Sequence, residues 1–264
     1  MALRLVTFDA LYTIIIPRLP VHVQYSQTFE PYLGTLQPDA IRESFRVAFR
    51  TLEAEQPAYA KGSQAWWTEV IKRTALGAGA DEKLLDISLP QIVPRLMGRF
   101  SSKEGYRAFD DTIPALRCLS DEMNILTAVV SNADSRLHLV LQDLGFPASL
   151  NPVVLSEEEG IEKPSPSIFL RALARVNAAA PRSQHPIRPE ECLHIGDELV
   201  ADYNGARAAG MQALLLRRAE LADERVHKGL EAVSGVEVVK DMDAVIRWRR
   251  SKRHRPYPQV ENIG

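Results

Sequence analysis

The segment Leu3-Arg4-Leu5-Val6-Thr7-Phe8-Asp9 is a short apolar run that ends abruptly at a carboxylate. Its composition is typical of a buried strand. Similar runs recur along the chain at Asn124–Val130, Pro152–Leu155, Cys192–Ile195, Met211–Leu216 and, more weakly, Val236–Val239. Segments with helical periodicity separate these runs, at Thr112–Ser120, Ser135–Leu144, Pro166–Val176, Ala201–Ala209 and Asp241–Trp248. Because strands that alternate with helices build parallel, helix-covered sheets, the sequence predicts an α/β fold with a doubly wound, Rossmann-like parallel sheet.

The stretch from Pro20 to Tyr106 breaks this alternation, because it contains no strand-like run. It shows helical periodicity instead, at about Val21–Leu33, Asp39–Glu55, Ser63–Thr74, Glu82–Leu85 and Leu89–Phe100. Proline and glycine residues punctuate the stretch. We therefore expect an inserted α-helical cap at residues 17–106, between the two parts of the core at 1–16 and 107–264. Cap and core are expected to meet at Asp9.

The composition is that of an ordinary globular protein, and it excludes several functions. The chain has 32 Lys and Arg residues against 34 Asp and Glu residues, a net charge of −2, which is not the basic balance of a nucleic-acid binder. No apolar stretch approaches the roughly 18 residues that span a bilayer. Cys118 and Cys192 lie far apart and suit neither a disulfide scaffold nor a zinc site. We expect a cytoplasmic protein that binds neither membranes nor nucleic acid; the sequence sets no oligomeric state.

Chemically reactive side chains directly follow the predicted strands. In chain order they are Asp9, the pair Ser131-Asn132, Lys163, and Asp197 with Asp202 shortly after it. In a doubly wound sheet, ligands bind beyond the carboxyl ends of the strands, so these side chains are expected to converge on one edge. The run Glu157-Glu158-Glu159 lies in the same part of the chain, and for it we expect only a solvated loop face.

Four motifs carry a family resemblance. They are Phe8-Asp9-Ala10-Leu11-Tyr12-Thr13, then Val130-Ser131-Asn132, then Lys163-Pro164-Ser165-Pro166-Ser167-Ile168-Phe169, and finally His194-Ile195-Gly196-Asp197-Glu198-Leu199-Val200-Ala201-Asp202 with the residues that follow to Met211. Together with the cap they resemble the haloacid dehalogenase-like (HAD) hydrolase superfamily. Phe45-Arg46 and Trp66-Trp67 in the cap also resemble the subgroup named haloacid dehalogenase-like hydrolase domain-containing protein 3.

The resemblance implies a reaction and the residues that perform it. Asp9 matches the nucleophile, which forms an aspartyl-phosphate with a small phosphorylated substrate. Ser131 would bind a phosphate oxygen, and Lys163 would neutralise charge on the nucleophile and the phosphate. Thr13 and Asn132 match positions next to these motifs and would contact the substrate.

The resemblance also implies a Mg²⁺ cofactor, a hard cation suited to oxygen ligands. The Asp9 carboxylate, the Leu11 carbonyl and Asp197 would hold it. Asp202 would either lie near the metal or orient Lys163.

Leu11 departs from the pattern of active phosphatases. These carry a second Asp two residues after the nucleophile, which protonates the leaving group and then activates water. Leu has no proton to give, and general acid–base catalysis is worth about 10²–10⁴-fold. The phosphohydrolase is therefore expected to be weak or unusual. The alternative is a catalytically impaired binding or regulatory protein with the same fold.

Two other reactions of the superfamily also lack the second Asp. Dehalogenases need no metal and resemble Ser-Ser-Asn at the fourth motif, so Asp197 argues against them. Phosphonate-cleaving relatives use a cap lysine, for which Lys61 or Lys72 would serve, but a solvated surface lysine is the preferred interpretation of both.

Three further features are interpreted from their context. His194 lies inside a predicted buried strand and is expected to be a core residue or a neighbour of the site rather than a catalyst. One of Trp66 and Trp67 is expected in the cap core, with the other open to lining a substrate pocket. The basic run Arg247–Arg255 suits either nuclear import or nucleic-acid contact, or else a solvated helix end.

Overall fold

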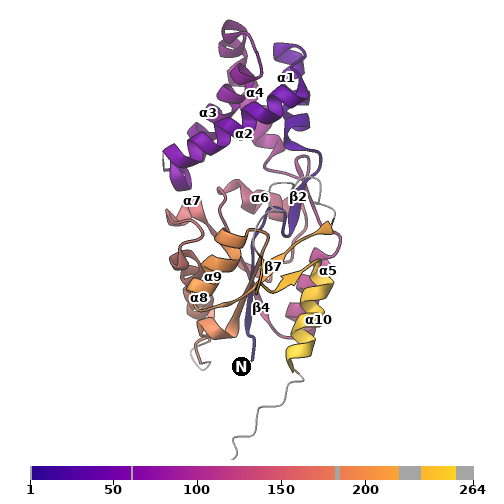
Figure 1. The fold of residues 1–264 in the computed structure, drawn as a ribbon, viewed down its shortest axis with the longest axis vertical. Helices are drawn as coiled ribbons and strands as arrows, with labels where there is room; N and C mark the ends of the chain where they lie inside the picture. The colour runs from indigo at the N-terminus through magenta and orange to yellow at the C-terminus, as the bar shows by residue number, and fades with distance from the viewer. Residues whose placement is uncertain (1, 61, 182–184, 220–232, 254–264) are drawn as a thin grey trace, which may run out of the picture.

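A six-stranded parallel sheet forms the centre of the computed structural model, which describes residues 2–60, 62–181, 185–219 and 233–253 (Figure 1). The strands are β1 (Leu5–Phe8), β4 (Leu126–Ser131), β5 (Leu150–Leu155), β6 (Cys192–Gly196), β7 (Gln212–Leu216) and β8 (Val238–Val239). Their order is β5-β4-β1-β6-β7-β8. The fully buried β1 lies between β4 and β6, and Phe8 pairs with Val129 on one side and Ile195 on the other. The prediction of a doubly wound α/β sheet is confirmed.

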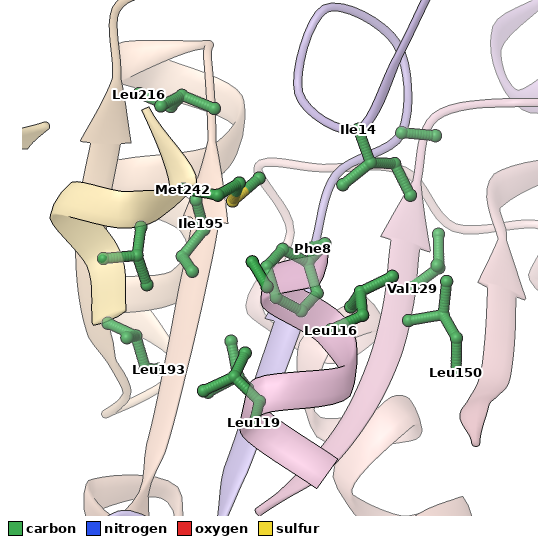
Figure 2. Packing of buried hydrophobic residues seen from close by; sticks show 14 of the residues in the cluster. Phe8, Ile14, Leu116, Leu119, Val129, Leu150, Leu193, Ile195, Leu216 and Met242 are labelled. Carbon is green, nitrogen blue, oxygen red and sulfur yellow. The ribbon is translucent and has the colours of Figure 1, made fainter. Parts of the chain in front are cut away.

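Helices cover both faces of the sheet, because successive residues of a strand point to opposite sides. Val6 and Phe8 face α5 (Thr112–Arg117), α6 (Arg136–Asp143) and α10 (Met242–Arg253). Figure 2 shows Phe8 beside Leu116 in this layer. On the other face Leu5 packs with α8 (Pro166–Ala179) and α9 (Gly205–Ala208).

Two short strands that the sequence did not indicate lie at the base of the helical stretch. β2 (Ile15–Pro17) and β3 (Tyr106–Ala108) form an antiparallel pair, in which Ile16 is opposite Arg107. Three residues are too few to show a period-two pattern, and the pairing partner lies far away in the chain. The pair ties the start of the helical stretch to its end.

Four helices fill the stretch between these two strands. They are α1 (Val21–Leu33), α2 (Pro38–Glu55), α3 (Ser63–Gly77) and α4 (Glu82–Arg99). They share an apolar cluster of their own, built around Tyr25, Phe29, Ile71 and Leu96. Figure 1 shows them as a group set apart from the helices that cover the sheet.

The structure differs from the predicted helices at α4. The expected break between Glu82–Leu85 and Leu89–Phe100 is wrong: α4 is one helix with Pro90 and Pro94 inside it. Each proline removes one backbone donor, but the helix continues because Leu85, Ile92 and Leu96 are all buried on its inner side.

The segment Ala201–Ala209, predicted as one helix, is a π-helical segment at Leu199–Asn204 followed by α9. In the π-helical part the Tyr203 N–H donates to the Glu198 carbonyl.

None of the helices in the described ranges is long and apolar enough to cross a membrane.

Candidate active site

The carboxyl ends of three neighbouring strands bring the predicted residues together. Asp9 directly follows β1, and its N–H donates to the Ile195 carbonyl of β6 at 2.9 Å. Ser131 is the last residue of β4, and Asp197 directly follows β6. Their side chains are almost fully buried, with exposed fractions of 6% for Asp9, 3% for Ser131 and 2% for Asp197. The alternation of strands and helices therefore places these three groups on one edge of the sheet, as expected.

Asp9 is held by a hydroxyl and an ammonium group. The Ser131 hydroxyl donates to Asp9 Oδ1 at 3.0 Å, and Lys163 Nζ donates to the same oxygen at 2.6 Å. The other oxygen, Oδ2, lies 3.5 Å from the Thr13 hydroxyl, a longer contact than either bond to Oδ1. Its lone pairs are therefore the ones most available to an electrophile or a cation.

Lys163 is shared between two carboxylates. Its Nζ also donates to Asp202 Oδ1 at 2.6 Å, and the lysine side chain is only 3% exposed. Asp202 receives two further contacts, from His194 Nε2 at 3.1 Å on Oδ1 and from the Glu198 N–H at 2.8 Å on Oδ2. Because both oxygens of Asp202 are engaged in this way, its geometry is that of a carboxylate that orients the lysine.

Gly196 makes room for this arrangement. A Cβ atom at Gly196 would lie 2.1 Å from Cγ of Asp202, so any side chain there would displace the carboxylate. His194, two residues earlier in β6, is fully buried and is also in contact with the Thr7 hydroxyl, at 2.8 Å from its Nδ1. As the sequence predicted, His194 is a core residue next to the site.

Asn132 holds the loop that carries Lys163. Its Nδ2 donates to the Lys163 carbonyl at 2.9 Å, and its Oδ1 accepts from the Lys163 N–H at 2.7 Å. Asn132 was predicted to contact substrate, but both ends of its amide are used by the protein. The side chain thus fixes the backbone of Lys163 relative to β4.

Asp197 and Thr13 complete the cluster. The Thr13 hydroxyl lies between two carboxylates, 3.5 Å from Asp9 Oδ2 and 3.4 Å from Asp197 Oδ1. Carboxylate oxygens of Asp9, Asp197 and Asp202 all lie within 4.8 Å of one another. Every donor atom in this group is a carboxylate oxygen. Two cations lie beside the three carboxylates: the Lys163 ammonium and the guanidinium of Arg217, which donates to the Asp197 carbonyl. These residues fit a hard divalent cation such as Mg²⁺.

The electrostatics reflect this crowding of charge. Burial raises the pKa of Asp9 above its ordinary value, and although Lys163 opposes this, the charge of Asp202 adds to the rise. For Asp202, burial acts in the same direction, but Lys163 and His194 outweigh it and its pKa falls. Burial also lowers the pKa of His194, which is therefore neutral at pH 7.

Arg218, which the sequence interpretation missed, supports the site from behind. This buried arginine follows β7 and donates to the Thr13 carbonyl through Nη2 at 2.9 Å. It also makes two bonds of 2.9 Å to the Asp111 carboxylate and stacks on the ring of Phe109 at 3.8 Å. A signal was present, because Arg217-Arg218 follows a predicted strand of the same sheet.

Leu11 lies at a cavity next to the polar cluster around Asp9. Its side chain is 38% exposed and lies at a cavity of about 130 Å³ between the helical stretch and the sheet. Ser131, Trp67 and Arg136 line the same cavity. The side chain of Leu11 thus borders the space beside Asp9, where it has no group that could transfer a proton.

The tryptophan pair divides as expected. Trp66 is 3% exposed and packs in the helical stretch against Leu52 and Val70. Trp67 lines the cavity beside the site, and its Nε1 donates to Asp134 Oδ2 at 2.8 Å.

The expectation of a solvated loop face for the run of three glutamates holds in part: Glu158 is exposed, but the run is helical and its other two side chains bind other parts of the protein. These residues form the short helix α7 (Ser156–Glu159). The Glu159 side chain is only 4% exposed and pairs with Arg175, while Glu157 accepts from the Ser63 N–H at 3.0 Å and the Ser135 N–H at 2.8 Å. The carboxylates bind backbone donors and an arginine that the spacing along the chain does not reveal.

Other predicted features lie away from the site or outside the described residues. Lys72 forms an exposed ion pair with Asp86 at 2.9 Å, and Lys61 lies outside the described residues. The basic run at Arg247–Arg255 lies on α10 up to residue 253, the last residue that the structure describes there. Within this run, Arg249 is buried, and Arg250 forms an ion pair with Glu122 at 3.8 Å. Both interpretations of this run stay predictions.

Comparison with known proteins gives a consistent family. A family model described as haloacid dehalogenase-like hydrolase matches residues 3–210. Haloacid dehalogenase-like hydrolase domain-containing protein 3 of Bos taurus is 30% identical over 229 residues, which cover 85% of this chain and 86% of that protein.

Two solved structures share the fold. A HAD phosphatase from Thermococcus onnurineus has a TM-score of 0.58 at 20% identity and covers 93% of this chain and 97% of its own. A 2-haloacid dehalogenase from Pseudomonas syringae has a TM-score of 0.57 at 20% identity, covering 93% of this chain and 99% of its own. Because one is a phosphatase and the other a dehalogenase, the choice of reaction rests on the side chains of the site.

Proposed function

Because the chain belongs to the haloacid dehalogenase-like hydrolase family, we propose that it is a Mg²⁺-dependent phosphohydrolase that acts on a small phosphorylated compound through an aspartyl-phosphate at Asp9. The observation that carries the proposal is the placement of Asp9, whose Oδ1 accepts short hydrogen bonds from Ser131 and Lys163 while Oδ2 has a longer contact of 3.5 Å with the Thr13 hydroxyl. This arrangement orients the carboxylate and leaves one oxygen for attack.

The residues divide the work of phosphoryl transfer. Asp9 Oδ2 would attack phosphorus, and the bond from phosphorus to the ester oxygen would break with its electron pair on that oxygen, which takes a proton from water. The Ser131 hydroxyl and the Lys163 ammonium would then bind the transferred phosphoryl oxygens, where negative charge gathers. Water would hydrolyse the aspartyl-phosphate and restore the carboxylate.

Asp9, Asp197 and the Leu11 carbonyl would hold Mg²⁺, and Asp202 would orient Lys163. When bound, the cation neutralises charge on the phosphate oxygens. Asp197 also argues against a dehalogenase, since it places a second carboxylate beside the position where a haloacid would carry its own.

We also propose that the chain is divided into two domains. The helical stretch at residues 17–106 would be a cap, and residues 1–16 and 107–264 would form the core. The cap helices have an apolar cluster separate from those of the sheet, and the β2–β3 pair forms both connections. Trp67, Ser63 and Ala58 of the cap donate to carboxylates of the core.

The test of function is hydrolysis of 4-nitrophenyl phosphate with Mg²⁺ and with EDTA. We expect turnover that needs the metal and falls at least about 10³-fold in Asp9→Asn, which keeps the shape of the side chain but removes the nucleophile. Asp110→Asn, the same change at an exposed carboxylate, serves as the matched control. An Asp9→Asn protein that is as active as Asp110→Asn would exclude Asp9 as the nucleophile. A folded, Mg²⁺-binding protein with no turnover would favour the alternative, a binding or regulatory protein.

A further inference from the structure

A second, larger cavity adjoins the candidate active site. It has a volume of about 280 Å³ and is enclosed by side chains of all four cap helices, including Val21 of α1, Phe45 of α2, Ile71 of α3 and Leu96 of α4. Apart from three tyrosines and Arg136, its lining is apolar. We call this cavity the apolar chamber. Its size is near the lower end of the range for small-molecule sites, about 300–1,000 Å³.

The apolar chamber adjoins the smaller cavity beside Asp9, and the two share part of their walls. Leu11, Trp67 and Tyr106 line both the chamber and the smaller cavity. The smaller cavity also reaches Ala10, the residue after Asp9, and Ser131, whose hydroxyl donates to Asp9. A phosphoryl group bound at Asp9 would therefore have its organic substituent directed past Leu11 into the chamber.

The charged group at the chamber wall is already neutralised. Arg136 donates to Asp134 through Nε at 2.8 Å and through Nη2 at 2.7 Å, and its guanidinium lies 4.8 Å from the ring centre of Trp67. The pair contributes no net charge, so a substrate carboxylate would gain little from it. Burial raises the pKa of Tyr106 to about 12, so this hydroxyl is neutral at pH 7.

Such a lining selects against hydrophilic substituents. Burying a hydroxyl or a charge without a partner is unfavourable, whereas burying an apolar group is favourable in proportion to its area. Several chamber residues are aromatic, among them Tyr25, Phe45 and Phe49, and their faces and edges suit a flat ring.

Building on the proposed function, we propose that the substrate is an aryl phosphomonoester whose ring system occupies the apolar chamber. Asp9 Oδ2 forms the bond to phosphorus, and the ester P–O bond breaks with its electron pair on the aryl oxygen. Because an aryl oxide is a weak base, it leaves without a proton from the enzyme and takes one from water afterwards. Leu11 is consistent with this chemistry: it extends the apolar wall at the position where the resemblance places an acid in active phosphatases.

The experiment compares two esters with leaving groups of similar acidity, 2-naphthyl phosphate and phenyl phosphate, in the presence of Mg²⁺. We expect kcat/KM to favour the naphthyl ester by about 10-fold or more, because its second ring buries further apolar area. Phe45→Ser should remove most of that preference. Val47→Ser, on the same helix but 54% exposed and outside the chamber lining, should retain it.

A second variant and a binding measurement guard against misfolding of Phe45→Ser. Val21→Phe, at a half-buried position of the lining, should fill the chamber and reduce turnover of the naphthyl ester more than that of the phenyl ester. Binding of 2-naphthol, followed by fluorescence in the Asp9→Asn protein, needs no catalysis and should weaken in both chamber variants.

The outcomes separate the two proposals. Equal turnover of both esters, without binding of 2-naphthol, would overturn the aryl substrate and leave the phosphohydrolase intact. Binding of 2-naphthol without turnover of any ester would overturn the phosphohydrolase, and the aryl phosphomonoester with it, and would leave only an apolar binding site.

Discussion

The carboxyl edge of the sheet and the apolar chamber lie side by side, yet the chain builds them in opposite ways. At the edge, Asp9, Lys163 and Asp202 are buried and linked by hydrogen bonds of 2.6 Å. In the chamber, side chains such as Phe45 and Ile71 come from separate helices and leave space between them. We propose that the edge, a preorganised set of charges, performs the reaction, and that the chamber, an apolar volume, selects the substituent. Each can therefore be changed separately.

Removing the charge of Lys163 should destabilise the buried cluster at the carboxyl edge, and we expect it to have the largest effect on stability. In Lys163→Gln, Asp9 and Asp202 would lose their shared counter-charge inside the protein. We expect the free energy of unfolding, measured with urea in EDTA at pH 7, to fall by about 3–5 kcal/mol. Burial acts to lower the pKa of Lys163, but the two carboxylates raise it overall, so its contribution is fully present at pH 7 and is lost only as the pH rises through that raised value.

Lys72→Gln is the matched control for the buried lysine. Lys72 pairs with Asp86 on the surface of the cap, where both side chains are partly open to solvent. Water and salt screen such a pair, so the urea midpoint should not change. Equal losses in the two variants would show that the buried cluster contributes nothing beyond an ordinary surface ion pair.

Leu11→Asp introduces a carboxyl group between the edge and the chamber, and so tests whether the missing element is a proton donor for the leaving group. If the groups around Asp9 are intact and only a proton donor is absent, hydrolysis of a phosphate ester with a poor leaving group, such as a phosphosugar, should rise by about 10–10³-fold. The gain should disappear in the double variant with Asp9→Asn. A stable, metal-binding Leu11→Asp protein that shows no gain on any ester would mean that protonation of the leaving group is not the missing step.

Trp67→Phe should have the smallest effect, because it removes one hydrogen bond between cap and core and keeps the ring. Burial alone would raise the pKa of Asp134, but the hydrogen bonds from Arg136, together with that from Trp67, lower it. We expect the free energy of unfolding to fall by about 1–2 kcal/mol at pH 7. Since Asp134 has a lowered pKa in the folded protein, its ionised form contributes stability above about pH 4, and the difference between variant and parent should shrink as the pH falls further.

Trp248→Phe provides the comparison for that measurement. Trp248 is half-buried, and its Nε1 donates to the Glu237 carboxylate at 3.4 Å in a solvent-exposed hydrogen bond, so the loss of that bond should cost less. If the Trp67→Phe effect stays constant down to pH 2, the hydrogen bond to Asp134 is not its cause.

The sequence predicted the edge far better than the chamber, for a topological reason. Once strands and helices alternate, the residue after each buried strand must lie at the carboxyl edge, which brings Asp9, Ser131 and Asp197 together without knowledge of any contact. The same rule would have found Arg217, the residue after β7, which donates to the Asp197 carbonyl, and beside it Arg218. The side chains at the carboxyl ends of parallel strands can thus be predicted from the sequence alone.

Structural features that depend on residues far away in the chain could not be predicted from the sequence. The strands β2 and β3 have three residues each and exist through their mutual pairing. Glu159 is an acidic residue in an acidic run, and only its packing against Arg175 reveals that it is buried. The apolar chamber depends on how four amphipathic helices pack, and periodicity shows which residues face inward but not the space left among them.

Binding of beryllofluoride with Mg²⁺ tests most directly whether Asp9 accepts a phosphoryl group, since this anion mimics a phosphoryl group on a carboxylate. Added at about 100 times its Kd, it should raise the melting temperature by about 5–10 °C in the parent protein and in Asp110→Asn. Asp9→Asn should show no rise. An equal rise in Asp9→Asn, or none in the parent protein, would contradict the assignment of Asp9 as the nucleophile at a metal-dependent phosphoryl site.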